Sequence, residues 1–166
     1  MKKEKNITIV LLIVYLIVLT WIILFKMQFS FADLSRIRHI NLIPFGESVI
    51  VNGKIDLDEI INNCIVFIPV GAYVSLLMPG GSFLRKLCPA FGVSLGYEAL
   101  QFAFAIGASD ITDLITNTAG GIVGIVLVSL LSKAFKDKTH KILNRAAIVC
   151  TVLVTVFFGS LLAFNM

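Results

Sequence analysis

Five polar side chains in an otherwise apolar part of the chain could do chemistry. They are Glu98, Gln101, Asp110, Asp113 and Asn117. Glu98 lies inside an apolar run, where a carboxylate is costly unless it is paired, protonated or hydrated. Gln101 follows three residues later and therefore shares its helical face. We favour an acid that binds a proton or a ligand here, and the alternative is a polar contact that fixes the packing of two helices.

Asp110 and Asp113 admit two interpretations. Asp110-x-x-Asp113 at the start of a helix is typical of an N-cap followed by an acid in the first turn, and this arrangement needs no ligand. The capping interpretation does not account for Asn117, which lies one helical turn further along. The second interpretation is therefore that the acids and the amide belong to one binding site.

One face of the helix that begins near Asp110 changes from acidic to small along its length. Its members are Asp110, Asp113, Asn117, Gly120 and Gly124. The Gly-x-x-x-Gly spacing lets the backbone of a second helix approach closely. If that second helix is the preceding apolar run, the carboxylates and amides of both helices converge at one depth.

The connection between the first two apolar runs supplies the opposite charge. It contains Arg36 and Arg38, followed by Asn41. Arginine is suited to bidentate pairing with a carboxylate or a phosphate. We therefore expect the arginines either to neutralise the acids or to complete a pocket for an anionic head group. No nucleophile motif, phosphate loop or metal-binding spacing occurs in the sequence, so no catalytic residue is assigned and no metal or cofactor is expected.

The composition indicates the environment that these residues occupy. Of the 166 residues 58% are hydrophobic and 14% are charged, and the mean hydropathy is +0.96. A soluble domain is roughly one quarter charged, so this chain is expected to be an integral membrane protein with one domain over residues 1–166. The net charge of +4 does not indicate a nucleic-acid partner, because the basic residues lie in separate loops.

Five apolar runs are expected to position the site. The predicted spans cover residues 7–25, 60–78, 87–106, 112–131 and 146–164, each close to the roughly 20 residues that cross a bilayer. If the N-terminus lies inside, ten of the 14 lysines and arginines fall in inner segments and four in outer ones. The sequence therefore predicts an all-α fold with five transmembrane helices, the N-terminus inside and the C-terminus outside. The acids and the arginine-bearing connection then face outward.

Four short motifs in this part of the chain resemble those of VanZ-like membrane proteins. The string RIRHINLIPF resembles their N-L-x-P-F segment, and NCIVFIPVG is similar to their N-x-x-x-F-x-P-x-G signature. The E-x-x-Q and D-x-x-D pairs follow in the same order, then N-T-x-G and a further glycine. The resemblance covers about residues 36–128. It implies a multi-pass protein of the bacterial plasma membrane that alters how lipoglycopeptides such as teicoplanin engage the cell envelope.

Three functions are compatible with these residues. The first is a binding protein for an amphiphile or an envelope lipid head group at the outward-facing polar site, with membrane lipids, a lipid-linked precursor or a lipoglycopeptide as partner. The second is a membrane enzyme acting on a lipid-linked envelope precursor, with Glu98 or Asp113 as general acid or base. The third is a structural or interaction protein whose polar residues serve packing alone. We rank binding first because the sequence offers no activated nucleophile.

Overall fold

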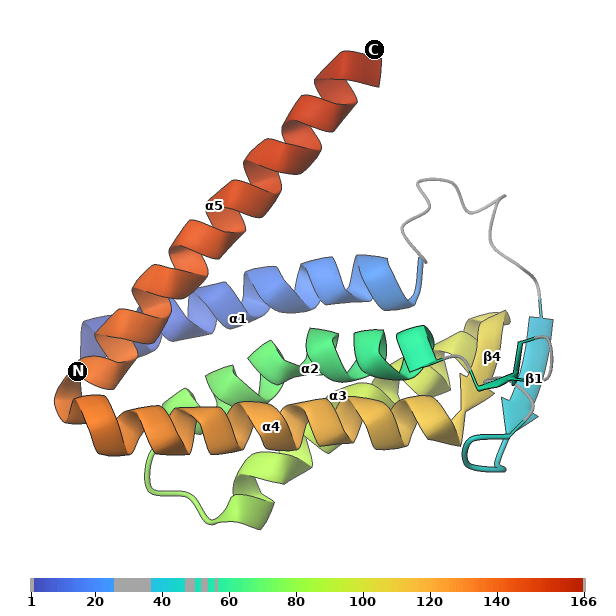
Figure 1. Cartoon of the computed structure of the whole chain (residues 1–166), viewed down its shortest axis with the longest axis horizontal. Coiled ribbons are helices and arrows are strands. Elements are labelled where there is room, and N and C mark those ends of the chain that lie inside the picture. Colours follow the sequence, from blue (N-terminus) through green and yellow to red (C-terminus); the bar gives the residue numbers. More distant parts are fainter. Residues whose placement is uncertain (1, 26–36, 47–49, 52–53, 56, 166) are drawn as a thin grey trace.

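The computed structural model describes residues 2–25, 37–46, 50–51, 54–55 and 57–165, and most of them are helical (Figure 1). The helices are α1 (Lys2–Ile23), α2 (Leu57–Leu77), α3 (Phe83–Phe104), α4 (Ile111–Phe135) and α5 (Thr139–Asn165), with a 3-10 turn (Lys136–Lys138) between the last two. The prediction of a mainly helical chain is confirmed. Within the described residues, three stretches are long and apolar enough to cross a membrane: Lys2–Ile23, Leu57–Leu77 and Ile111–Val156.

The helices extend beyond the apolar runs that predicted them. α1 begins at Lys2 instead of residue 7, and α5 begins at Thr139 instead of residue 146. Helical hydrogen bonds form within one segment and do not require an apolar side chain, so a helix continues into its polar flanks. Hydropathy therefore located the helices but underestimated their length.

Two short sheets correct the all-α prediction. Strand β1 (Ile37–Asn41) pairs in parallel with β4 (Ile106–Asp110), and β2 (Ile50–Val51) pairs antiparallel with β3 (Lys54–Ile55). α3 ends at Phe104 because Ala105 takes a left-handed conformation with φ 54°, and its N–H bonds back to the carbonyl of Gln101. Such a left-handed residue ends a helix, so the chain leaves α3 as strand β4. The predicted continuation of this helix to residue 106 was wrong.

α2 and α4 pack with their backbones in close contact. A Cβ atom added to Gly120 would lie 2.0 Å from the carbonyl oxygen of Cys64, and one added to Gly124 would lie 2.1 Å from that of Ile68. On the facing helix, a Cβ at Gly71 would lie 2.0 Å from the oxygen of Gly121. The close approach predicted from the glycine spacing is therefore confirmed, but the helix that meets Gly120 and Gly124 is α2 and not α3.

α1 and α3 complete the core, whereas α5 diverges from it. The core cluster joins Leu19 of α1, Phe67 and Val70 of α2, and Ala90 and Tyr97 of α3. α5 lies beside the N-terminal half of α1 and then leads away from the other helices (Figure 1). The polar ends of α2, α3 and α4 gather at the opposite end of α1, next to the β1–β4 pair.

Candidate functional site

Asp110 connects three parts of the candidate site. Its backbone N–H donates to Glu98 Oε2 at 2.8 Å, and its own Oδ1 accepts the N–H of Thr112 at 2.7 Å. Asn41 Nδ2 of β1 donates to Asp110 Oδ2 at 3.2 Å. Asp110 is thus the N-cap of α4, as its position before a helix predicted. In addition, it ties the strand pair and α3 to the start of α4.

Glu98 is buried beside this cap, with only 8% of its surface exposed. Its carboxylate accepts the Asp110 N–H, and its backbone oxygen accepts the Ser109 hydroxyl at 2.6 Å. Asp110 and Asp113 lie close enough to interact electrostatically with Glu98. The structure therefore brings three predicted acids together, although they come from α3, β4 and α4.

Asp113 is linked to α2 by Asn63, which was not among the residues predicted for the site. Asn63 Nδ2 donates to Asp113 Oδ1 at 2.6 Å. Asn62 and Asn63 are consecutive amides at the start of an otherwise apolar run, and this pattern could have indicated them. Their contribution could not be assigned from the sequence because it depends on α2 being the neighbour of α4.

A cavity of about 370 Å³ lies beside Asn63, Asp110 and Asp113, and we call it the polar cavity. Glu98 and Asn41 do not line it. Its apolar wall consists of Ile22 and Ile23 of α1, Val66 of α2 and Ala108 of β4. Its polar wall consists of Glu59, Asn62, Asn63, Gln101, Asp110 and Asp113. Among the described residues, no three His, Cys, Asp or Glu side chains are placed to hold a metal ion. The cavity offers carboxylate and amide groups beside an apolar surface.

Gln101 lines this cavity and carries an amide oxygen without a partner. The residue is 5% exposed, and its Nε2 donates to the carbonyl of Ile23 at 3.4 Å. Its Oε1 is buried and has no hydrogen-bond partner in the structure. A buried acceptor without a partner costs about 1 to 3 kcal/mol. Gly107 of β4 lies beside this amide, since a Cβ added to Gly107 would lie 3.5 Å from Gln101 Nε2.

The remaining predicted residues occupy different surroundings. Asn117 does not line the polar cavity, and its Nδ2 donates to Ser94 Oγ of α3 at 3.1 Å. Arg38 is directed to the end of α3, where Nη2 donates to the Ala103 carbonyl at 3.3 Å and the guanidinium lies 5.4 Å from the Phe102 ring centre. Arg36 lies outside the described residues. Of the predicted basic connection, Asn41 reaches the acids and Arg38 does not.

The fold and the site define a helical membrane protein with a buried carboxylate and amide cluster at one end of its bundle. A family model described as VanZ/LLP1 matches residues 12–132, which include the whole polar cavity. Protein VanZ of Enterococcus faecium is 38% identical over 148 residues, which cover 88% of this chain and 86% of that protein. The chain therefore belongs to the VanZ/LLP1 family, and the resemblance seen in its motifs is confirmed. No solved structure matches it.

Proposed function

We propose that this protein binds the head group of an envelope amphiphile in the polar cavity and thereby lowers susceptibility to teicoplanin-type lipoglycopeptides. The protein acts in this proposal as a multi-pass component of the bacterial plasma membrane. The observation that carries the proposal is that Gln101, a residue that lines the cavity, has a buried Oε1 without a hydrogen-bond partner. An acceptor of this kind is satisfied when a ligand supplies a donor.

The topology in this proposal has five crossings, with the N-terminus inside and the C-terminus outside. α3 is included because its 22 residues extend roughly 33 Å, enough for a hydrocarbon core of about 30 Å. It also packs against both α2 and α4, which are apolar enough to cross a membrane. The distribution of lysine and arginine supports this orientation, in which the polar cavity faces the outer surface.

The lining of the cavity suggests the chemistry of the ligand. Carboxylate oxygens accept hydrogen bonds and favour cations. The Gln101 amide oxygen also accepts hydrogen bonds. The donor is therefore an amine or a hydroxyl group of the head group. Ile22, Ile23 and Val66 form an apolar wall that suits the first carbons of an attached chain. A volume of about 370 Å³ lies at the lower end of small-molecule sites, so it accommodates a head group and not an entire lipoglycopeptide.

The link to resistance is an extension of the family resemblance. VanZ-like proteins include one that lowers susceptibility to teicoplanin, and the relative from Enterococcus faecium carries the name Protein VanZ. Holding or displacing an amphiphile at the outer surface changes the lipid environment in which a lipoglycopeptide anchors. Susceptibility then falls without chemical modification of the drug.

Native mass spectrometry of detergent-released protein tests the proposal, with co-purifying lipids identified. The variant Gln101→Met retains the shape of the side chain but removes the free acceptor. We expect it to lose a lipid that the wild type retains, and to unfold at the same or a higher temperature. Removal of an unsatisfied buried oxygen does not destabilise the fold, and the bond from Nε2 to the Ile23 carbonyl, which is also lost, is long at 3.4 Å.

Asn117→Leu is the matched control. Asn117 Oδ1 is also buried without a partner, and its amide also donates one hydrogen bond, but the residue does not line the cavity. We expect this variant to retain the lipid. If both variants keep the lipid, the carboxylates and amides at the cavity serve packing alone. The same conclusion follows if the wild type retains no lipid and Gln101→Met unfolds more easily. If overexpression causes a modified precursor to accumulate and Asp113→Asn abolishes this accumulation, the protein is an enzyme and the binding proposal is wrong.

A further inference from the structure

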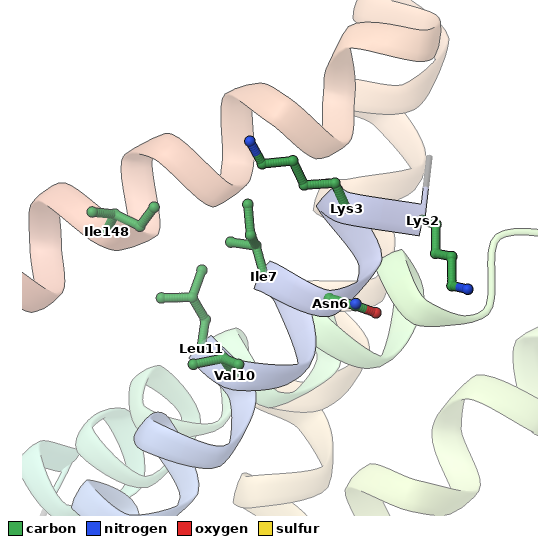
Figure 2. A pocket seen from close by; sticks show the side chains of 7 residues that line it. All are labelled: Lys2, Lys3, Asn6, Ile7, Val10, Leu11 and Ile148. Atoms are coloured by element: carbon green, nitrogen blue, oxygen red, sulfur yellow. The ribbon is translucent and has the colours of Figure 1, made fainter.

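A second cavity lies between α1 and α5, at the end of α1 remote from the polar cavity (Figure 2). It has a volume of about 590 Å³. Lys2 and Lys3 border it at the start of α1, and Ile7, Val10, Leu11 and Ile148 form its apolar part. We call it the basic groove. It shares no lining residue with the polar cavity, so it is a separate candidate site.

The groove results from the way α5 crosses α1. The Thr8 hydroxyl donates to Asn144 Oδ1 at 2.9 Å, and Asn144 Nδ2 donates to the Glu4 carbonyl at 3.0 Å. Beyond this contact α5 leads away from the bundle (Figure 1). Two apolar side chains that follow this contact, Val10 of α1 and Ile148 of α5, are therefore left 59% and 42% exposed.

We propose that the basic groove binds one anionic phospholipid. An acyl chain lies along Ile7, Val10 and Ile148, and the phosphate lies beside Lys3, whose side chain extends toward α5, with Lys2 on the other side of the same helical turn (Figure 2). The first turn of α1 adds free backbone N–H groups and the positive end of the helix dipole, which favour an anion. Lysine combines an apolar stem with a charged end, so it suits the boundary between chain and head group.

The charges around the groove agree with this occupant. Glu4 is the acid of this helical turn, but its carboxylate accepts a hydrogen bond from Asn144 Nδ2 at 3.0 Å and does not line the groove. In the proposed topology Lys2 and Lys3 lie at the inner surface, where anionic lipids attract basic residues and basic clefts between helices bind their head groups. A second copy of the chain would place an apolar helix against two lysine ammonium groups. The charge complementarity therefore favours a lipid.

Native mass spectrometry with titrated lipids tests this site. Phosphatidylglycerol and phosphatidylcholine with identical acyl chains are the two probes. We expect Lys2→Gln/Lys3→Gln to weaken phosphatidylglycerol binding by about tenfold and to leave phosphatidylcholine binding unchanged. The matched control Lys136→Gln/Lys138→Gln removes the same charge from the exposed turn between α4 and α5, and it should retain the affinity.

A second variant tests the apolar part of the groove. Ile148→Trp adds bulk at a position that is 42% exposed, so the fold tolerates it while the acyl chain loses space. We expect it to weaken phosphatidylglycerol binding with both lysines intact. Both losses should persist when they are combined with Gln101→Met, which removes any phosphatidylglycerol held at the polar cavity through its glycerol hydroxyls, and this separates the two sites. Equal affinity for both lipids, an equal loss in the control, or a dimer that Ile148→Trp abolishes would overturn the proposal.

Discussion

Gly120→Ala is the substitution that most directly tests the packing of α4 on α2. The new Cβ would lie 2.0 Å from the carbonyl oxygen of Cys64 and 3.0 Å from the Cβ of Phe67. The first of these atoms belongs to the backbone of α2, so no change of side-chain rotamer relieves the overlap. The helices must separate for the methyl group to fit.

The size of the effect follows from this geometry. An ordinary contact begins at 3.4 Å, so the shortfall from 2.0 Å is about 1.4 Å. Overpacking of a well-packed interface typically costs about 1 to 3 kcal/mol, and a clash with backbone belongs at the upper end. The higher helix propensity of alanine returns about 1 kcal/mol. We therefore expect a net loss of about 2 kcal/mol or more.

The control comes from the same chain. A Cβ added to Gly96 of α3 would meet no atom within 4 Å. Gly96→Ala should therefore keep or raise stability, because the higher helix propensity of alanine is the only effect that remains. In a thermal unfolding assay in one detergent, a loss of about 2 kcal/mol corresponds to a decrease of about 4 to 8 °C for a chain of this size.

The comparison has a clear refuting result. If Gly120→Ala and Gly96→Ala unfold at the same temperature, the α2–α4 contact is looser than the structure describes. The same substitution at Gly124, whose Cβ would lie 2.1 Å from the oxygen of Ile68, should behave like Gly120→Ala. A loss at one glycine alone would indicate a shifted register between the two helices.

Two further substitutions test the hydrogen bonds that hold the remaining elements. Asn144→Leu should destabilise the protein by about 1 to 3 kcal/mol, because it removes the hydrogen bonds that join Asn144 to Thr8 and to the Glu4 carbonyl, each worth about 0.5 to 1.5 kcal/mol. Thr151→Val, whose hydroxyl bonds only within α5, should change the unfolding temperature little. Asp110→Ala should cost about 1 kcal/mol more than Asp110→Ser, measured by circular dichroism on heating, because both variants lose the carboxylate oxygen bonded by Asn41 but serine retains a capping oxygen for Thr112. Equal losses for both Asp110 variants would exclude the capping role.

Local features of the chain were predictable from the sequence. An apolar run of sufficient length forms a helix in a membrane, because every backbone polar group must be satisfied within the segment. The cap at Asp110 followed from its residue type and its place before a helix. The close approach at Gly120 and Gly124 followed from small residues spaced one turn apart. Each of these depends on residues that are neighbours in sequence.

The short strands were not predictable in the same way. β1 and β4 pair Asn41 with Asp110, and neither segment alone has the alternating pattern of a strand. Their pairing depends on the left-handed turn at Ala105, which redirects the chain out of α3. The residues around Ala105 are apolar or small, so the sequence predicted that the helix continues to residue 106.

The sequence by itself determined a helical membrane protein of the VanZ/LLP1 family, with its costly polar residues concentrated between positions 98 and 117. Only the tertiary structure decided that Asn63 contacts Asp113 across 50 residues and that Gln101 borders a cavity with an oxygen left free. It also decided that Arg38 lies against Phe102 and that α5 opens a groove on α1. The physical reason is that hydropathy and capping act within one segment, whereas these contacts depend on which helices pack together.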